Sequence, residues 1–183
     1  MGFYGKVFAV MAIALSISGA LHARKHSIGT SWSFAGIGIT YNMQMKEDAF
    51  IRAGARIEMS EPFLGRSLRP GASASFTWNN IYGSTLSRNG NLISFFAGAG
   101  AEAGFCKDFR LARTDETLHG GFLGLKGTAG INIRYERNID ITIAVAPVLG
   151  MHLSIKDETV MMRYYRYGLL QTIMPEITIS YRF

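Results

Sequence analysis

Apolar and polar residues alternate with a period of two along most of the chain. The alternation is clearest over Ile139–Ile155, where every odd-numbered position is apolar or proline. A β-strand sends successive side chains to opposite faces, so this period predicts strands with one apolar and one polar face. Eight such segments follow one another: Ser27–Ser33, Gly36–Met45, Ala49–Ser60, Leu68–Trp78, Leu92–Phe105, Gly121–Tyr135, Ile139–Ile155 and Ile173–Phe183.

The first residues predict export. Lys6 precedes an apolar run over Val7–Ile17, and the small residues after it lead to Leu21-His22-Ala23, an acceptable cleavage site. We expect a signal peptide at 1–23 and one domain at 24–183. The alternative is a membrane anchor, but the apolar run is short for a span of about 20 residues.

The eight segments are best explained by a closed barrel in a membrane. Hydrophobic residues make up 48% of the chain and there are 21 glycines, yet no segment after the signal reaches the length of an apolar spanning helix. Only helices and closed barrels satisfy the backbone within lipid. We therefore predict an all-β fold: an eight-stranded antiparallel transmembrane up-and-down β-barrel.

The turns predict an orientation, with both chain ends in the periplasm. The turns Lys46–Asp48 and Glu136–Asn138 are short, as periplasmic turns are. The turn Asn79–Asn91 is long, and its Asn89-Gly90 pair favours strands that extend into it. Pro147 predicts a bulge or a lost ladder bond. The expected outer loops are Glu61–Ser67, Lys107–Gly120 and Lys156–Thr172. The expected periplasmic-end aromatics face outward: Tyr41, Phe76, Trp78, Tyr135, Tyr181 and Phe183.

Charge and cysteine content narrow the function. The net charge is +6, but the basic residues are scattered, so no nucleic-acid interface is expected. Cys106 is the only cysteine, which excludes an intramolecular disulfide. The four histidines are too dispersed for a metal site, and no cofactor or metal is expected.

Ionisable residues fall on the face predicted to line the interior. An eight-stranded barrel is just wide enough for its own side chains, so buried charges must pair. We predict a plug of ion pairs in which Glu102 and Glu176 have basic partners. The alternative is a narrow or gated ion path. The inward charges are Arg52, Arg56, Glu58, Glu102, Lys126, Arg134, Asp140, Glu176 and Arg182.

The exported start, the eight segments and the final Tyr181-Arg182-Phe183 resemble small OmpA/OmpX-type outer-membrane barrels of Gram-negative bacteria. The stretches Phe95–Phe105 and Phe122–Val148 look particularly like uncharacterised porin-family barrels of Bacteroidetes. The resemblance implies an outer-membrane monomer in contact with lipid and lipopolysaccharide. It also implies that the assembly machinery reads Tyr181 and Phe183. The protein's role would then be structural or in surface binding through outer loops, without catalysis.

Two local patterns offer alternatives. His152 and Ser154, with Glu158 beyond them, are similar to the His-x-Ser pair of outer-membrane lipid A deacylases, in which serine is the nucleophile and histidine the base. The asparagine that follows the serine in that pattern is absent, because Ile155 and Lys156 stand there. The run Arg163–Tyr167 predicts either an aromatic girdle or a binding surface.

Overall fold

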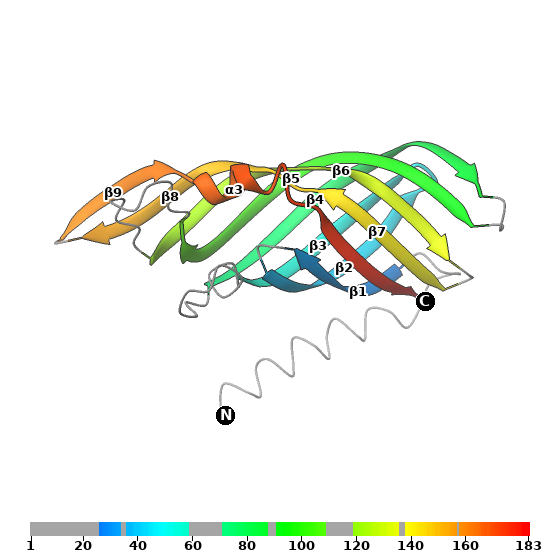
Figure 1. The fold of residues 1–183 in the computed structure, drawn as a ribbon, viewed down its shortest axis with the longest axis horizontal. Helices are drawn as coiled ribbons and strands as arrows, with labels where there is room; N and C mark the ends of the chain where they lie inside the picture. Colours follow the sequence, from blue (N-terminus) through cyan, green and yellow to red (C-terminus); the bar gives the residue numbers. More distant parts are fainter. Residues whose placement is uncertain are drawn as a thin grey trace, which may run out of the picture.

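The computed structural model describes residues 26–33, 36–58, 71–87, 91–108, 119–135, 138–156 and 158–183. These residues form ten strands and one short helix (Figure 1). The elements are β1 His26–Ser33, β2 Gly36–Lys46, β3 Ala49–Glu58, β4 Gly71–Leu86, β5 Leu92–Lys107, β6 His119–Tyr135, β7 Ile139–Val145, β8 Val148–Lys156, β9 Thr159–Tyr164, α3 Arg166–Leu170 and β10 Glu176–Arg182.

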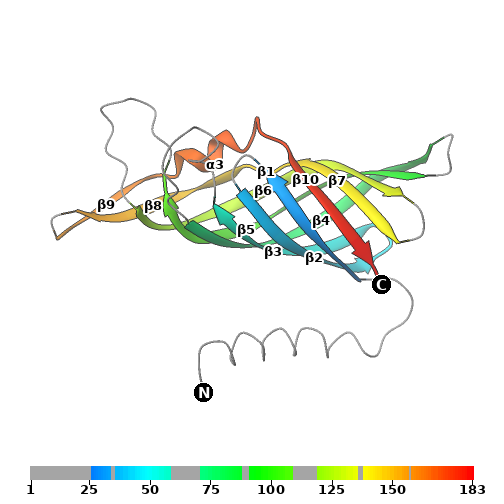
Figure 2. The ribbon, with the colours of Figure 1, turned by 60° about the horizontal axis from the view of Figure 1, so that its bottom comes forward.

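Eight of these strands close into an antiparallel barrel. Strands β1 to β7 pair with their neighbours in chain order, and β10 closes the ring by pairing with β7 on one side and β1 on the other. Figure 2 shows β1, β10 and β7 side by side. The predicted all-β fold with an eight-stranded antiparallel barrel is confirmed.

The register fixes the tilt of the strands. A row of directly paired residues can be followed once round the barrel. It begins at Tyr135 on β6 and returns to β6 at Leu125, ten residues earlier (135 minus 125). Ten residues at about 3.3 Å each, set against eight strands about 4.8 Å apart, give a tilt of roughly 40°. The row passes through Ile139, Tyr181, Ile28, Tyr41, Ala53, Phe76 and Ala101.

The two faces of the wall differ as the alternation predicts. Large apolar side chains point outward, and Leu125 is 72% exposed and Phe76 51% exposed. Most inward positions carry polar, charged or small residues, such as Thr77 and Glu102. Glycine lets strands approach closely, because a Cβ on Gly100 would lie 1.8 Å from the carbonyl oxygen of Phe76.

The expected seventh strand, Ile139–Ile155, is interrupted. Strand β7 ends at Val145 and β8 begins at Val148, so one continuous strand is not formed, and the lost ladder bond expected at Pro147 is confirmed. Gly127 N–H donates to Pro147 O at 2.9 Å, and proline has no N–H to return the bond. The register against β6 is unchanged across the break, but β7 pairs with β10 whereas β8 pairs with β9.

Two other expected connections are largely ordered strand or helix. The extension of both strands into the predicted turn Asn79–Asn91 is confirmed: β4 continues to Leu86 and β5 begins at Leu92, with a bulge between Ile81 and Gly83. Figure 1 shows this hairpin projecting past the other strands at the end that holds the C-terminus. The predicted loop Lys156–Thr172 instead contains β9 and α3, because Val160, Met162 and Tyr164 continue the period-two pattern of β8.

The remaining strand ends differ by a few residues. Strand β4 is described only from Gly71, and the closing strand begins at Glu176, after Pro175. Residues 59–70 and 109–118 lie outside the described residues, and with them the expected loop Glu61–Ser67 and the middle of the expected loop Lys107–Gly120. The expected signal peptide at 1–23 also lies outside them.

Candidate functional site

Five charged side chains meet in the middle of the barrel and are called here the central cluster. Arg56 donates to Glu58 Oε1 at 3.0 Å from Nε and to Glu102 Oε1 at 2.7 Å from Nη2. Lys126 Nζ donates to the other oxygen of Glu102 at 2.7 Å. Glu176 Oε2 lies 3.9 Å from Arg56 Nη1. The cluster spans β3, β5, β6 and β10, and adjacent space measures only about 20 Å³.

The cluster forms where inward-facing side chains from four strands meet. Glu102 is 1% exposed, so its charge would be costly without partners. Arg56 and Lys126 each approach one of its oxygens, which is the arrangement that a buried carboxylate requires. Both glutamates predicted to have basic partners, Glu102 and Glu176, therefore lie beside Arg56.

Arg52 occupies a separate level of the interior. Its Nε donates to Asn42 Oδ1 at 2.7 Å and its Nη2 to Thr142 Oγ1 at 3.4 Å. Its guanidinium carbon lies 5.6 Å from the ring centre of Phe50 and 5.5 Å from that of Phe96. The two rings meet edge to face at 5.3 Å. Arg52 is thus held by neutral partners and by cation–π contacts.

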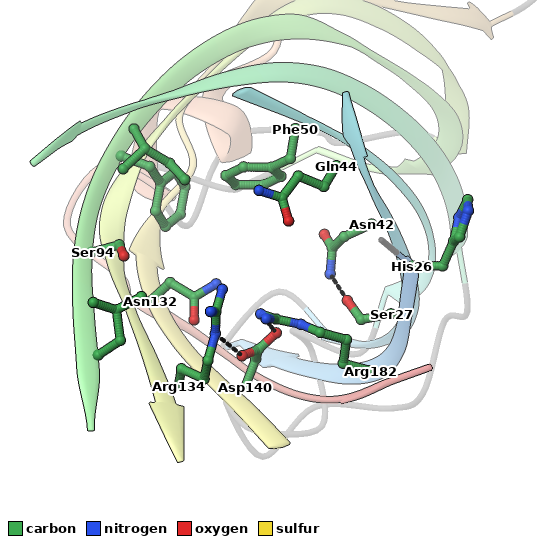
Figure 3. A pocket seen from close by; sticks show the side chains of 13 residues that line it. His26, Ser27, Asn42, Gln44, Phe50, Ser94, Asn132, Arg134, Asp140 and Arg182 are labelled. Carbon is green, nitrogen blue, oxygen red and sulfur yellow. Dashed lines mark hydrogen bonds and ion pairs between the residues drawn. The ribbon is translucent and has the colours of Figure 1, made fainter. Parts of the chain in front are cut away.

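The remaining predicted charges lie at the end of the barrel that holds His26 and Phe183, called here the terminal mouth. Arg182 Nη2 donates to Asp140 Oδ2, and Arg134 Nε lies 3.9 Å from Asp140 Oδ1 (Figure 3). Tyr181 and Phe183 point outward at this end, 55% and 43% exposed.

The opposite end, called here the distal mouth, is filled by the chain itself. Residues 165–171, called here the plug segment, fold inward after β9. Tyr165 is 1% exposed and stacks on Phe122 at 4.2 Å between ring centres. Its backbone N–H donates to Gly150 O at 2.9 Å, and the thiol of Cys106 lies 3.7 Å from its hydroxyl. Tyr165 follows β9, outside the spanning strands, and burial raises its pKa well above that of free tyrosine.

Side chains at both ends of the plug segment tie it to the wall. The Asp108 carboxylate accepts the backbone N–H groups of Arg166 at 3.2 Å and Tyr167 at 2.9 Å, which caps α3. Gln171 is buried, and its amide, placed so that both atoms are satisfied, donates to Ala146 O at 3.1 Å and accepts from Arg56 Nη2 at 3.2 Å. The plug segment therefore contacts the central cluster directly.

The expected Arg163–Tyr167 surface is wrong in part. Tyr165 and Tyr167 are buried in the distal mouth, 1% and 3% exposed. Of the three tyrosines in the run, only Tyr164 points outward, 76% exposed. The strand period ends at Tyr164, and the chain then turns inward at Tyr165.

The His152–Ser154 pair does not form a catalytic arrangement. Both side chains lie on the inward face of β8 and are buried. His152 Nε2 lies 2.9 Å from the carbonyl oxygen of Cys106, and no hydrogen bond joins His152 to Ser154 in the described structure. Glu158 lies at the exposed β8–β9 turn with φ 64°. A serine nucleophile needs a base within hydrogen-bond reach, and this geometry lacks one.

Within the described ranges, no group of three His, Cys, Asp or Glu side chains is placed to hold a metal ion. In the same ranges, no helix is long and apolar enough to cross a membrane.

The strand arrangement is similar to that of a solved barrel. The crystal structure of the N-terminal β-barrel domain of Pseudomonas aeruginosa OprF matches with a TM-score of 0.53 and 10% sequence identity, covering 88% of this chain and 100% of that chain. The chain has the fold of this barrel domain. The expected likeness to small eight-stranded barrels is thereby confirmed at the level of fold.

Two further structures show weaker likeness. Both are of Ail, the attachment invasion locus protein of Yersinia pestis, and one is a complex with the heparin analogue sucrose octasulfate. Their TM-scores are 0.38 and 0.35 at 13% and 14% identity, covering 87% of this chain and 97% of theirs. No family model and no curated protein matches the sequence.

Several interior residues were missed by the sequence reasoning. Phe50, Phe96 and Phe122 occupy inward positions although aromatics were expected outside. Their even numbers put them on the polar parity of their strands, which was a usable signal. Asp108 and Gln171 had no such signal, because both lie where loops were expected.

Proposed function

We propose that this protein is an integral outer-membrane barrel whose interior is plugged and does not conduct ions. The observation that carries the proposal is the link between the plug segment and the central cluster, made by Gln171 and Arg56. Together they fill the distal mouth and the middle of the barrel. A hydrated ion would have to separate Glu102 from both of its basic partners.

The outer surface supports a place in lipid. Apolar side chains cover it on β1, β2, β6 and β8, and the β8–β9 hairpin extends this face with Val160, Met162 and Tyr164. With both chain ends in the periplasm, the distal mouth faces outside. Its contacts there are with lipid and lipopolysaccharide. A signal peptide at 1–23 directs export, and Tyr181 and Phe183 serve as the signal for the outer-membrane assembly machinery. The protein acts as a monomer.

The role that fits this arrangement is structural or one of surface binding. The binding elements are the segments around the distal mouth, Lys107–Gly120 and Lys156–Thr172. Asp108, in the first of these, holds the plug segment, in the second, by accepting the backbone N–H groups of Arg166 and Tyr167. A loop that is already held in place loses less conformational entropy when its side chains bind a partner.

Planar-bilayer recording tests the plug. We expect wild-type protein to add no conductance steps in 1 M KCl at about 100 mV. The double variant Tyr165→Ala, Gln171→Ala removes two of the side chains that hold the plug segment and should give flickering steps. Tyr164→Ala, at an outward position, is the matched control and should stay silent. Stable steps from wild-type protein would instead favour the small pore.

The second candidate function is lipid A deacylation by His152 and Ser154. Mass spectrometry of lipid A incubated with the purified barrel distinguishes it from the proposed function. We expect no loss of acyl chains. Loss that disappears in Ser154→Ala would replace the proposed function with hydrolysis.

A further inference from the structure

The terminal mouth holds a cavity that the plug does not fill. Its volume is about 60 Å³, enough for about four to six waters or one small anion. Figure 3 shows Asn42, Asn132, Arg134, Asp140 and Arg182 arranged around an open centre. Phe50, Phe96, Ile81 and Leu92 supply an apolar side to the same cavity.

The charges around this cavity do not balance. Arg134, Asp140 and Arg182 line it, and Asp140 is the single carboxylate among the described residues of its lining. Arg52 stands behind it, since it bonds to Asn42 and covers the rings of Phe50 and Phe96. Among the described lining residues, two guanidinium groups, those of Arg134 and Arg182, therefore face one carboxylate.

Arg52 does not line this cavity and does not depend on it for a counter-charge. It is 7% exposed and lines the space beside the central cluster together with Glu176, and Glu176 and Asp140 offset part of its charge. Glu47 and Asp48 lie in the exposed β2–β3 turn and do not line the cavity. An anion in the cavity would supply the missing negative charge.

Unused polar atoms indicate which anion fits. Arg134 Nε is buried without a hydrogen-bond acceptor, and Asn132 Oδ1 is buried without a donor. Both residues line the cavity. A ligand that satisfies them carries an oxygen acceptor for Arg134 and an O–H donor for Asn132. Hydrogen phosphate carries both at neutral pH, whereas sulfate, phosphodiesters and the dianions of phosphate monoesters carry no O–H.

We propose that the terminal mouth is a binding site for a small phosphate anion, held by Arg134 and Arg182 and by Asn132. Arg134 is the partly exposed member, with 40% of its side chain accessible, so it meets the ligand at entry. The ligand comes from solution at the end where the chain terminates, and the site functions whether or not the barrel conducts.

Isothermal titration calorimetry tests the site. The folded barrel in dodecyl maltoside is titrated with inorganic phosphate at pH 7, with ionic strength held constant by NaCl. We expect saturable binding at one site and weaker binding of sulfate. Arg134→Gln should weaken phosphate binding at least tenfold. Lys46→Gln, an exposed cation at the same end that does not line the cavity, should bind like wild type.

Three outcomes would overturn the proposal: no saturable heat, unchanged affinity in Arg134→Gln, or an equal loss in Lys46→Gln. If Arg134→Gln does not fold, Asn132→Ala takes its place with the same expectation. A repeat in nanodiscs of phosphatidylglycerol and of phosphatidylcholine separates free phosphate from lipid headgroups. We expect equal affinity in both, and competition by phosphatidylglycerol would assign the site to lipid phosphate instead.

Discussion

Glu102 accepts a hydrogen bond of 2.7 Å from Arg56, 46 residues away in the chain, across the interior of the barrel. Lys126 holds the other carboxylate oxygen at the same distance. This pairing joins β3, β5 and β6 through one nearly inaccessible side chain. Removing it leaves two cations without their shared partner.

Glu102→Ala should therefore lower the free energy of unfolding by about 3–5 kcal/mol, the range seen when one member of a buried ion pair is lost. Urea unfolding in detergent, followed by the gel shift between folded and boiled protein, measures the change. Glu47→Gln alters an exposed carboxylate and should leave stability within about 0.5 kcal/mol. Equal stability of Glu102→Ala and wild type would show that the central cluster does not support the fold.

The plug segment predicts slow modification of Cys106. The thiol is 2% exposed and lies beneath Tyr165. Maleimide labelling of folded protein should be slow, and Tyr165→Ala should speed it at least tenfold by removing the covering ring. The neighbouring variant Tyr164→Ala should label like wild type. If Tyr165→Ala also labels at the wild-type rate, Tyr165 does not cover the thiol.

Asp108→Ala should loosen α3. Loss of a capping side chain typically costs about 0.5–2 kcal/mol, so the amides of Arg166 and Tyr167 should exchange with solvent about 2–30 times faster. Hydrogen exchange followed by mass spectrometry measures this in detergent. Asp48→Ala, in the exposed β2–β3 turn, is the control and should not affect these amides. Unchanged exchange in Asp108→Ala would exclude the cap as the anchor of the plug segment.

Much of the barrel could be predicted from the sequence because alternation records the two faces of each strand. Ile139–Ile155 kept its faces even across Pro147, since its register against β6 does not shift. The chain after Ile155 was harder to predict. In the sequence, the turn residues 156–158 look the same whether a loop or a new strand follows them. The inward turn at Tyr165 depends on Phe122 and Asp108, which are distant in the chain.

The interior was predictable as a set of charges but not as a set of partners. Parity placed Arg52 and Arg56 on the same face, yet Arg52 hydrogen-bonds to neutral groups and Arg56 to carboxylates. The difference arises from the register between strands, which a single sequence does not state. Gln171 reaches Arg56 only because the plug segment enters the barrel.

The outward face predicts a depth-dependent cost of charge. Leu125 lies midway along β6 and is 72% exposed on the outer surface. Leu125→Arg should lower the stability of the barrel in a bilayer by about 2–4 kcal/mol. Thr85→Arg, on the projecting β4–β5 hairpin, should cost less than about 1 kcal/mol. Equal costs at the two positions would place both in the same environment.

The claim that the outer surface lies in lipid can be tested without mutation, because both tryptophans of the chain, Trp32 and Trp78, point outward at 41% and 40% exposure. Fluorescence of the protein in vesicles containing brominated phospholipid measures their contact with acyl chains. We predict strong quenching by the brominated lipid and weak quenching by acrylamide added to the water. Strong acrylamide quenching without quenching by lipid would contradict a barrel embedded in a membrane.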